Sequence, residues 1–170
     1  MTAPQEASTF GCDETKMKPR IYVDTSVIGG CFDKEFESPS LRLIESFKTG
    51  EAIIVVSDLT LLELELAPAE VKGILENISD GNKECIELQE EARELARLYI
   101  AVGVIGPGKI VEAQHIAMAT ISYVDVLVSW NFKHIVNLQR IHGYNSVNLR
   151  HGYPLLEIRT PQEVTQYEND

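Results

Sequence analysis

Three short runs of β-favouring apolar residues recur along the chain, and each run ends abruptly at polar residues. Between the runs, apolar residues return every three or four positions, which is the spacing of one face of a helix. Strands that alternate with helices predict parallel pairing, because a helix carries the chain back to the start of the next strand. The runs lie at 21–23, 53–56 and 126–128, with a weaker fourth at 155–158. We therefore expect an α/β fold, a three-layer α/β/α sandwich around a central, mainly parallel sheet of four or five strands.

The segments between the runs carry the helical signals. Ser57 is the expected N-cap of the helix that follows the second run, and Pro68 interrupts that helix. The clearest amphipathic pattern comes later, with glutamates on the wet side of the helix. The expected helices cover 41–47, 59–66, 84–100 and 110–123, and a further helix begins in 132–138.

The length of 170 residues is typical of one domain. We expect a single domain at 19–162, a disordered tail at 1–18 and a short C-terminal tail at 163–170. The formal net charge is −11, from 15 Lys and Arg against 26 Asp and Glu, so the overall field repels nucleic acid. A nucleic-acid function therefore needs a local basic patch or a metal ion.

The cellular location is predicted from the apolar runs and the cysteines. No run approaches the roughly 20 apolar residues of a membrane span. The 3 cysteines have scattered spacings, which is typical of reduced thiols. We therefore expect a cytoplasmic protein with no membrane partner.

Asp24 is the first candidate for a functional role. Ligands of an open parallel sheet bind beyond the carboxyl ends of the strands, and Asp24 directly follows the first run. Thr25 and Ser26 add two hydroxyl groups at the same point. Capping of a turn is the structural alternative for Asp24.

The helix after the second run supplies a second carboxylate. Glu63 and Glu65 lie two positions apart, so their side chains point about 200° from each other. Glu63 shares a stripe with Leu59, Leu62 and Leu66, so we expect Glu63 to face the sheet. An inward carboxylate is costly unless it is paired or bound to a metal, and a salt bridge to an arginine is the structural alternative.

The apolar helix at 110–123 carries Glu112 and, three positions later, His115. A lone histidine in such a helix is more often a hydrogen-bonded core residue than a ligand, so Glu112 is the more informative residue. After the third run, Ser129 and Asn131 lie at the carboxyl end of the strand. Asp125 precedes that strand, so we expect it at the opposite edge with a structural role.

Four of these side chains offer oxygen atoms at one edge of the sheet: Asp24, Glu63, Glu112 and Asn131. Carboxylate and amide oxygens are ligands for Mg²⁺ or Mn²⁺ rather than for zinc. Clustered carboxylates repel one another, so at least one of them is expected to have a raised pKa.

The order of these segments resembles a PIN domain, the nuclease fold of VapC-type toxins and related RNA-processing enzymes. The resemblance covers about residues 20–160, and its most distinctive piece is the closing sequence LVSWNFKH from Leu127 to His134. The segments that carry it are 21–30, 57–65, 112–117 and 125–135.

The resemblance implies that Asp24, Glu63 and Glu112 hold the metal and act in catalysis, with Asn131 as the fourth catalytic position and Ser129 as a polar helper. Two positions depart from the family pattern. The third is most often Asp and here is Glu112, whose longer side chain displaces its carboxylate. The fourth is often Asp and here is Asn131, which removes one negative charge and weakens cation binding.

The resemblance further implies a Mg²⁺- or Mn²⁺-dependent endoribonuclease that hydrolyses phosphodiester bonds in RNA, in the manner of a toxin of a toxin–antitoxin pair. A small antitoxin with a basic side chain near Asp24 and Glu63, and a homodimer formed through helices, are the implied partners. Substrate contacts are expected from Thr25, Ser26, Ser129, Lys133 and His115, and RNA backbone contacts also from Lys109, His134, Arg140 and His142.

Two other readings stay open. The departures at Glu112 and Asn131 and the charge of −11 favour an inactive PIN-like module that binds RNA or a protein partner without cutting. A haloacid-dehalogenase-type phosphotransferase or a phospho-accepting receiver also places an Asp after a first apolar strand. The dehalogenase pattern needs a second Asp two residues later, where this chain has Ser26.

Overall fold

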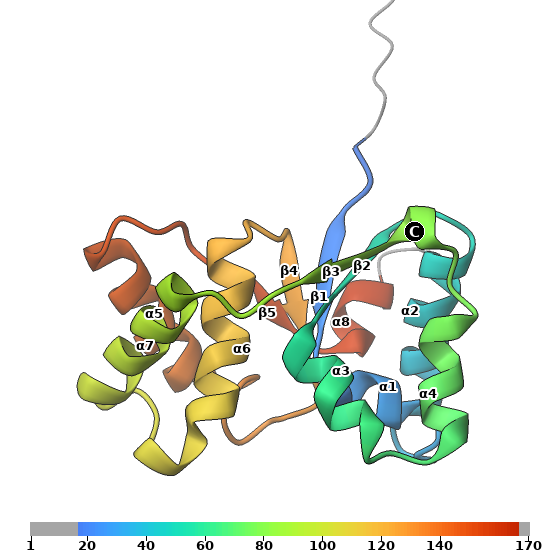
Figure 1. Cartoon of the computed structure of the whole chain (residues 1–170), viewed down its shortest axis with the longest axis horizontal. Coiled ribbons are helices and arrows are strands. Elements are labelled where there is room, and N and C mark those ends of the chain that lie inside the picture. The colour runs from blue at the N-terminus through green and yellow to red at the C-terminus, as the bar shows by residue number, and fades with distance from the viewer. Residues whose placement is uncertain (1–16, 167–170) are drawn as a thin grey trace, which may run out of the picture.

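The central sheet has five strands, all parallel, in the order β3-β2-β1-β4-β5 (Figure 1). The computed structural model describes residues 17–166, so the predicted tail at residues 1–16 and residues 167–170 lie outside the described residues. The strands are β1 (Arg20–Val23), β2 (Ile53–Ser57), β3 (Lys83–Ile86), β4 (Val126–Val128) and β5 (Ile158–Arg159). The predicted α/β fold with a sheet of four or five strands is confirmed.

Helices cover both faces of this sheet. No helix within residues 17–166 has the length and apolar character needed to cross a membrane. The helices are α1 (Thr25–Gly30), α2 (Glu37–Lys48), α3 (Asp58–Glu65), α4 (Ala69–Glu76), α5 (Glu90–Ala101), α6 (Ile110–Ile121), α7 (Leu138–Arg150) and α8 (Pro161–Thr165), with short 3₁₀ turns η1 (Asp80–Asn82) and η2 (Pro107–Lys109).

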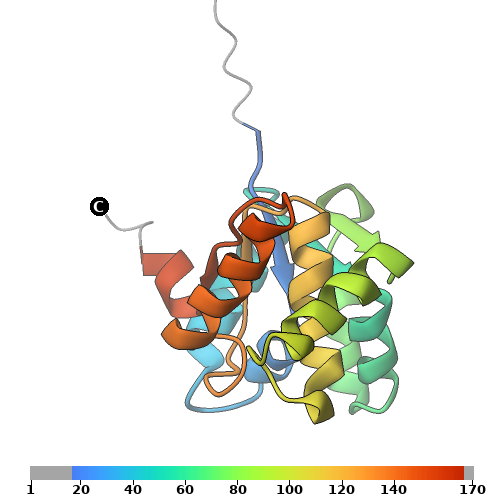
Figure 2. The same cartoon turned by 90° about the vertical axis from the view of Figure 1, so that its left-hand side faces the viewer.

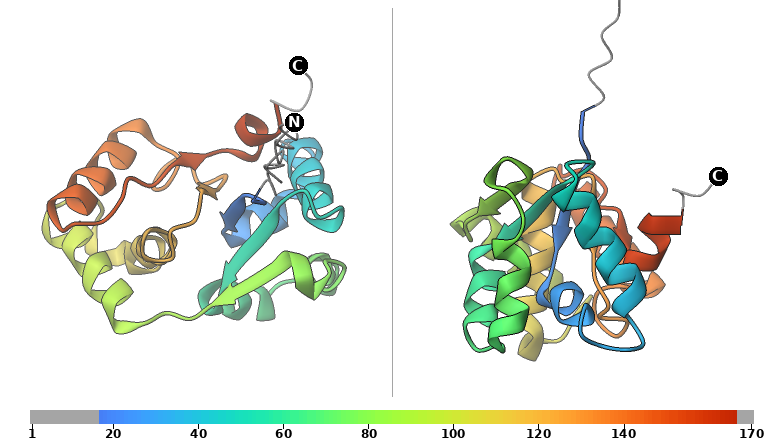
Figure 3. Two further views of the ribbon diagram at one scale, coloured as in Figure 1. Left: turned by 90° about the horizontal axis from the view of Figure 1, so that it is seen from above. Right: turned by 90° about the vertical axis from the view of Figure 1, so that its right-hand side faces the viewer.

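The alternation of side chains along β1 divides the core into two layers. Ile21 and Val23 point to one face and pack with residues of α1, α2 and α4. Tyr22 points to the opposite face and packs with residues of α5, α6 and α7. Figure 2 shows the layer of α5, α6 and α7 from outside. In Figure 3, the left view shows the strands between the two layers, and the right view shows the layer of α2 and α4 from outside. Because β1 is covered on both sides, its carboxyl end lies in the middle of the molecule.

One predicted helix begins later than expected. The helix predicted at 84–100 starts only at Glu90, because the preceding residues form β3 and pair with β2, Cys85 opposite Val56. This error arises because hydrogen bonds with a partner distant in sequence outweigh local periodicity. The helix predicted to begin in 132–138 starts at Leu138, at the end of that range, where the side chain of Asn137 caps it by accepting from the backbone N–H of Arg140.

The folded region extends past the predicted domain end at 162. Helix α8 begins with a capping box in which Thr160 and Glu163 satisfy each other's backbone N–H groups. Thr165 is buried, and α8 packs against α2. Residues 163–165, predicted as part of a tail, therefore belong to the domain.

Gly30 allows α1 to pack closely against the segment after β4. A Cβ atom at this position would lie 2.7 Å from Ser40 Oγ and 2.8 Å from Trp130 Nε1. These two atoms are themselves hydrogen-bonded, since Trp130 Nε1 donates to Ser40 Oγ over 2.8 Å. At Gly29, by contrast, a Cβ would meet nothing within 4 Å.

Candidate active site

A cavity of about 370 Å³ opens at the carboxyl edge of the sheet, and we call it the acidic cavity. Its walls come from the end of β1 and the start of α1, from α3, from α6 and from the segment after β4. The lining residues are Asp24, Thr25, Ser26, Glu63, Val111, Glu112, His115, Asn131 and Ile135. The topology thus brings together residues that are more than a hundred positions apart in the chain.

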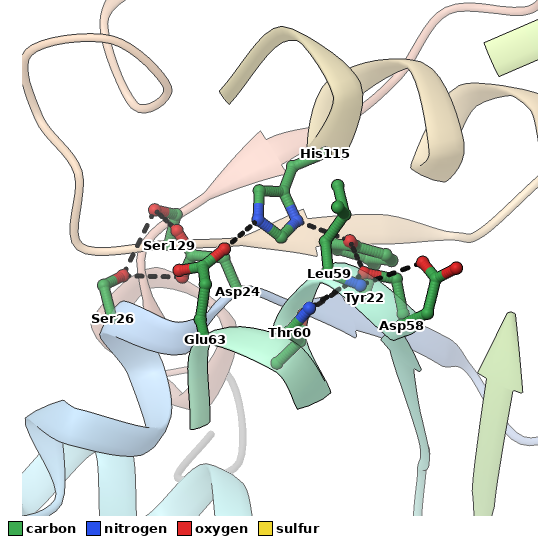
Figure 4. Close-up of polar contacts among 10 residues, drawn as sticks. Tyr22, Asp24, Ser26, Asp58, Leu59, Thr60, Glu63, His115 and Ser129 are labelled. Atoms are coloured by element: carbon green, nitrogen blue, oxygen red, sulfur yellow. Dashed lines mark hydrogen bonds and ion pairs between the residues drawn. The ribbon is translucent and has the colours of Figure 1, made fainter. Parts of the chain in front are cut away.

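Asp24 lies in the floor of the acidic cavity and is held by two serines (Figure 4). Ser26 Oγ donates to Asp24 Oδ1 over 2.6 Å, and Ser129 Oγ donates to Oδ2 over 2.7 Å. Burial raises the pKa of Asp24, while the two hydroxyl donors lower it. The predicted raised pKa is confirmed, but its main cause is burial, and the repulsion from Glu63 is a smaller contribution.

Glu63 pairs with a histidine rather than with an arginine. His115 Nε2 lies 2.9 Å from Glu63 Oε1, and His115 Nδ1 lies 2.6 Å from Tyr22 Oη (Figure 4). The phenol in turn donates to Ser57 Oγ over 2.8 Å. The hydrogen bond from His115 lowers the pKa of Glu63, so a hydrogen-bonded chain that starts in the core favours the ionised carboxylate.

The side of α3 that faces inward differs from the predicted stripe. Leu62 is 61% exposed and Leu66 is 93% exposed, whereas Thr60 and Leu64 are buried. Glu63 nevertheless lines the acidic cavity, because α3 lies over the edge of the sheet and presents this position to α6. The leucine spacing was therefore a poor guide to the buried face, although the residue chosen from it does face the cavity.

Glu112 and Asn131 lie at the rim of the acidic cavity with other partners. Glu112 Oε1 is 3.7 Å from Lys109 Nζ. Asn131 Oδ1 accepts a hydrogen bond from the backbone N–H of His134 over 3.0 Å. The Asn131 oxygen is thus engaged in the turn that follows β4.

Several solved structures have the same arrangement of strands and helices. VapBC2 from Rickettsia felis, crystallised with a DNA fragment from its promoter, matches at a TM-score of 0.53 and 14% identity over 83% of this chain and 98% of that chain. FitAcB from Neisseria gonorrhoeae matches at a TM-score of 0.53 and 13% identity, over 83% of this chain and 97% of that chain. DNA-bound VapBC from Salmonella typhimurium matches at a TM-score of 0.50 and 19% identity, over 84% of this chain and 98% of that chain. The chain has a VapC-like PIN fold.

The evidence for the PIN fold comes from structure rather than from sequence. No protein-family model matches the chain, and no curated protein matches it. Identities of 13–19% show the fold alone. The roles of individual residues in this PIN fold therefore have to be inferred from the geometry of the acidic cavity.

Three predicted residues lie apart from the acidic cavity. Ser129 is completely buried and donates to Asp24, so it orients that carboxylate and has no exposed surface for a substrate. Lys133 lines a separate, neighbouring cavity. Asp125 lies at the opposite edge of the sheet, where its Oδ2 accepts from the backbone N–H of Arg20 over 2.7 Å, which confirms its structural role.

Sequence reasoning missed Tyr22 and Ser57, which fix the orientation of His115. A signal was present, since a tyrosine in the middle of a buried strand needs a partner for its hydroxyl group. The partner itself, on a helix more than ninety positions away, was not predictable from the pattern.

The donor chemistry of the acidic cavity suits a hard cation. Asp24, Glu63 and Glu112 supply carboxylate oxygens, and the hydroxyl of Thr25 is buried without a hydrogen-bond partner among the described residues. Within residues 17–166, no three or more His, Cys, Asp or Glu side chains lie close enough together to hold a metal ion as they stand. In this PIN fold, cation binding would therefore require the carboxylates of the acidic cavity to move closer together.

Proposed function

We propose that this PIN domain is a Mg²⁺- or Mn²⁺-dependent endoribonuclease that hydrolyses phosphodiester bonds in RNA. The observation that carries the proposal is the presence of Asp24, Glu63 and Glu112 in one cavity at the carboxyl edge of β1. Carboxylates in this position are the usual means of holding a divalent cation against a phosphate.

The residues of the chain have distinct tasks in this proposal. Asp24, held by Ser26 and Ser129, is a fixed anionic group at the base of the cavity. Asp24, Glu63 and Glu112 would hold the cation, which when bound would neutralise the phosphate and lower the pKa of a water molecule. The two serines keep both oxygens of Asp24 in place, so little reorganisation of this group is needed when the substrate binds.

Glu63 is suited to orient the attacking water. Its pKa is lowered, chiefly by the hydrogen bond from His115, so the carboxylate stays ionised and is a weak base. Glu63 Oε1 contacts His115 Nε2, whereas Oε2 forms no hydrogen bond with residues 17–166. Oε2 can therefore accept a hydrogen bond from the water while the imidazole holds Oε1.

We further propose a toxin role with a small antitoxin protein as partner. This rests on the structural likeness to VapBC2, VapBC and FitAcB. A basic side chain of the antitoxin near Asp24 and Glu63 would neutralise their charge and block the acidic cavity. A homodimer formed through helices and a cytoplasmic location belong to the same proposal.

The proposal is tested by Mn²⁺ titration calorimetry on the parent and on Asp24→Asn, followed by incubation of both proteins with a labelled RNA of mixed sequence. We expect the parent to bind Mn²⁺ and to cleave, and the variant to lose both. Metal binding without cleavage in the parent would count against nuclease activity on that RNA. Absence of binding and of cleavage would contradict the proposal.

A second candidate function is a PIN-like module that binds RNA or a protein without cutting. Two observations favour it. Within residues 17–166, the carboxylates of the acidic cavity are not close enough together to hold a metal ion as they stand, and the side-chain oxygen of Asn131 already accepts a hydrogen bond from the backbone of His134. RNA binding that persists without any metal-dependent cleavage would support this candidate.

A further inference from the structure

We propose that a second, cationic cavity beside the acidic cavity binds the phosphate groups of a single RNA strand and holds that strand across the proposed cleavage site. The inference rests on the proposed function. The cationic cavity has a volume of about 650 Å³ and lies between the loop after α5, the segment after β4 and the first turns of α7. The residues that carry the argument are Lys133, Asn137, Gln139 and Arg140.

Positive charge gathers here in a protein whose net charge is −11. Neither Lys133 nor Arg140 forms an ion pair with any described residue. The pKa of His134 is lowered, first by burial and then by the positive charges of Lys109, Lys133 and Arg140, with Glu112 opposing. The two cationic side chains that line the cavity, Lys133 and Arg140, come from different segments, the stretch after β4 and α7.

Most of the hydrogen-bond donors at the cationic cavity have no protein partner. Arg140 Nη1 donates to the carbonyl oxygen of Val104, which leaves the other guanidinium N–H groups without a partner among the described residues. Neither Lys133 Nζ nor the Gln139 amide makes a hydrogen bond with residues 17–166. Guanidinium and ammonium groups with free N–H bonds are suited to phosphate oxygens.

The wall of the cationic cavity is closely packed. A Cβ atom at Gly143 would lie 2.7 Å from Val104 Cγ1, so α7 and the loop after α5 are in tight contact. The bond from Arg140 to Val104 joins the same two segments. The guanidinium is therefore held in place before a ligand arrives, which reduces the entropy lost on binding.

The two cavities share one wall. In the segment after β4, Asn131 and Ile135 line the acidic cavity, and Lys133 and Asn137 line the cationic cavity. The carboxylates at the acidic cavity repel phosphate, so a strand that reaches them needs cationic contacts nearby. The shared wall supplies such contacts within one stretch of chain.

The test measures binding without cleavage. The background is Asp24→Asn in EDTA, and the probe is a 5′-fluorescent single-stranded RNA of mixed sequence, followed by anisotropy between 50 mM and 1 M salt. The variants are Lys133→Gln, Arg140→Gln and the double variant. The matched controls are Lys34→Gln, an exposed lysine, and Arg150→Gln, an exposed arginine at the far end of α7.

Each lost phosphate contact lowers the slope of log K against log salt by about 0.7 for a single strand, so the double variant should lose about 1.4. If the two contacts contribute nothing at 1 M salt, this corresponds to roughly 60-fold weaker binding at 50 mM. Lys133→Gln alone should show half of this change in slope. It removes no hydrogen bond or ion pair with residues 17–166, so it remains informative if Arg140→Gln does not fold. The controls should keep the slope of the background protein.

Unchanged affinity and slope in the double variant would overturn the inference and leave the proposed nuclease function standing, because the parent would still cleave RNA. Failure of the proposed function would appear separately, as absence of metal-dependent cleavage by the parent. If the double variant lost binding to a labelled poly-glutamate peptide but kept its RNA binding, the cationic cavity would be assigned to an acidic protein segment. That result would overturn the RNA inference.

Discussion

Replacement of His115 by alanine tests whether the core holds the proposed catalytic Glu63 in place. His115 is 3% exposed, and its imidazole bridges two groups, with 2.9 Å from Nε2 to Glu63 Oε1 and 2.6 Å from Nδ1 to Tyr22 Oη. His115→Ala removes both contacts and leaves space between α6 and β1. We expect a clear loss of stability.

The magnitude follows from the three changes. A hydrogen bond to a charged group contributes about 1.5–3 kcal/mol, but the Glu63 side chain is 41% exposed and water replaces much of it, so the lower end applies. Tyr22 keeps its bond to Ser57, so the neutral bond costs about 1 kcal/mol or less. The space left by the ring adds about 1 kcal/mol. The sum is a loss of about 3 kcal/mol in the free energy of unfolding.

The assay is urea unfolding at pH 7, with His151→Ala as the matched control because His151 is exposed. The control should change stability by less than about 0.5 kcal/mol. A double-mutant cycle of His115→Ala with Glu63→Gln should give a coupling energy of about 1 kcal/mol. A loss below about 1 kcal/mol for His115→Ala, or a coupling near zero, would refute the reasoning that the imidazole holds Glu63.

Gly30→Ala is expected to cost about 1–3 kcal/mol in thermal unfolding because its Cβ would overlap a buried hydrogen bond, whereas Gly29→Ala should be neutral or stabilising by up to about 1 kcal/mol. Equal effects at the two positions would contradict this. Burial raises the pKa of Asp24 above its ordinary value of 3.8, so stability falls as the pH rises from that value through the folded-state pKa. Asp24→Asn should remove this fall. If the unfolding free energy of the variant changed with pH in parallel with that of the parent, the prediction would be wrong. Burial raises the pKa of the Cys31 thiol to about 11, so in a variant without the third cysteine, Cys31 should react with a thiol reagent only on unfolding, while exposed Cys85 reacts in the folded protein. Immediate reaction of both thiols would argue against the packing around Cys31.

Much of the fold was predictable because its signals are local. Each buried strand needs a run of apolar residues, and the runs that became β1, β2 and β4 were identified with their polar ends. Ser57 was identified as a cap from its residue type, and its side chain does accept from the backbone N–H of Thr60. The strand β3 was missed, because a partly exposed edge strand has no continuous apolar run and depends on β2 for its hydrogen bonds.

The candidate site was predictable only as a set of residues at strand ends. Position along the sequence indicated that Asp24 and Glu63 belong to one edge of the sheet, since parallel strands end on the same side. Glu112 was identified as a carboxylate in an apolar helix, and the resemblance to PIN domains implied its place in the site. The partners of these side chains were not predictable. The pairing of Glu63 with His115, and the burial of Ser129 beneath Asp24, each join elements that are distant in sequence.

Local patterns of polarity in the sequence are enough to specify three of the strands, β1, β2 and β4, and the chemical types of residue at their ends. Which carboxylate is buried and which is paired with an imidazole depends on the tertiary structure. Those outcomes depend on the distances between α3, α6 and the end of β1, and these distances are set by the packing of the two helical layers on the sheet. The opposite pKa shifts of Asp24 and Glu63 follow from that packing, since one group loses water and the other gains a hydrogen-bond donor.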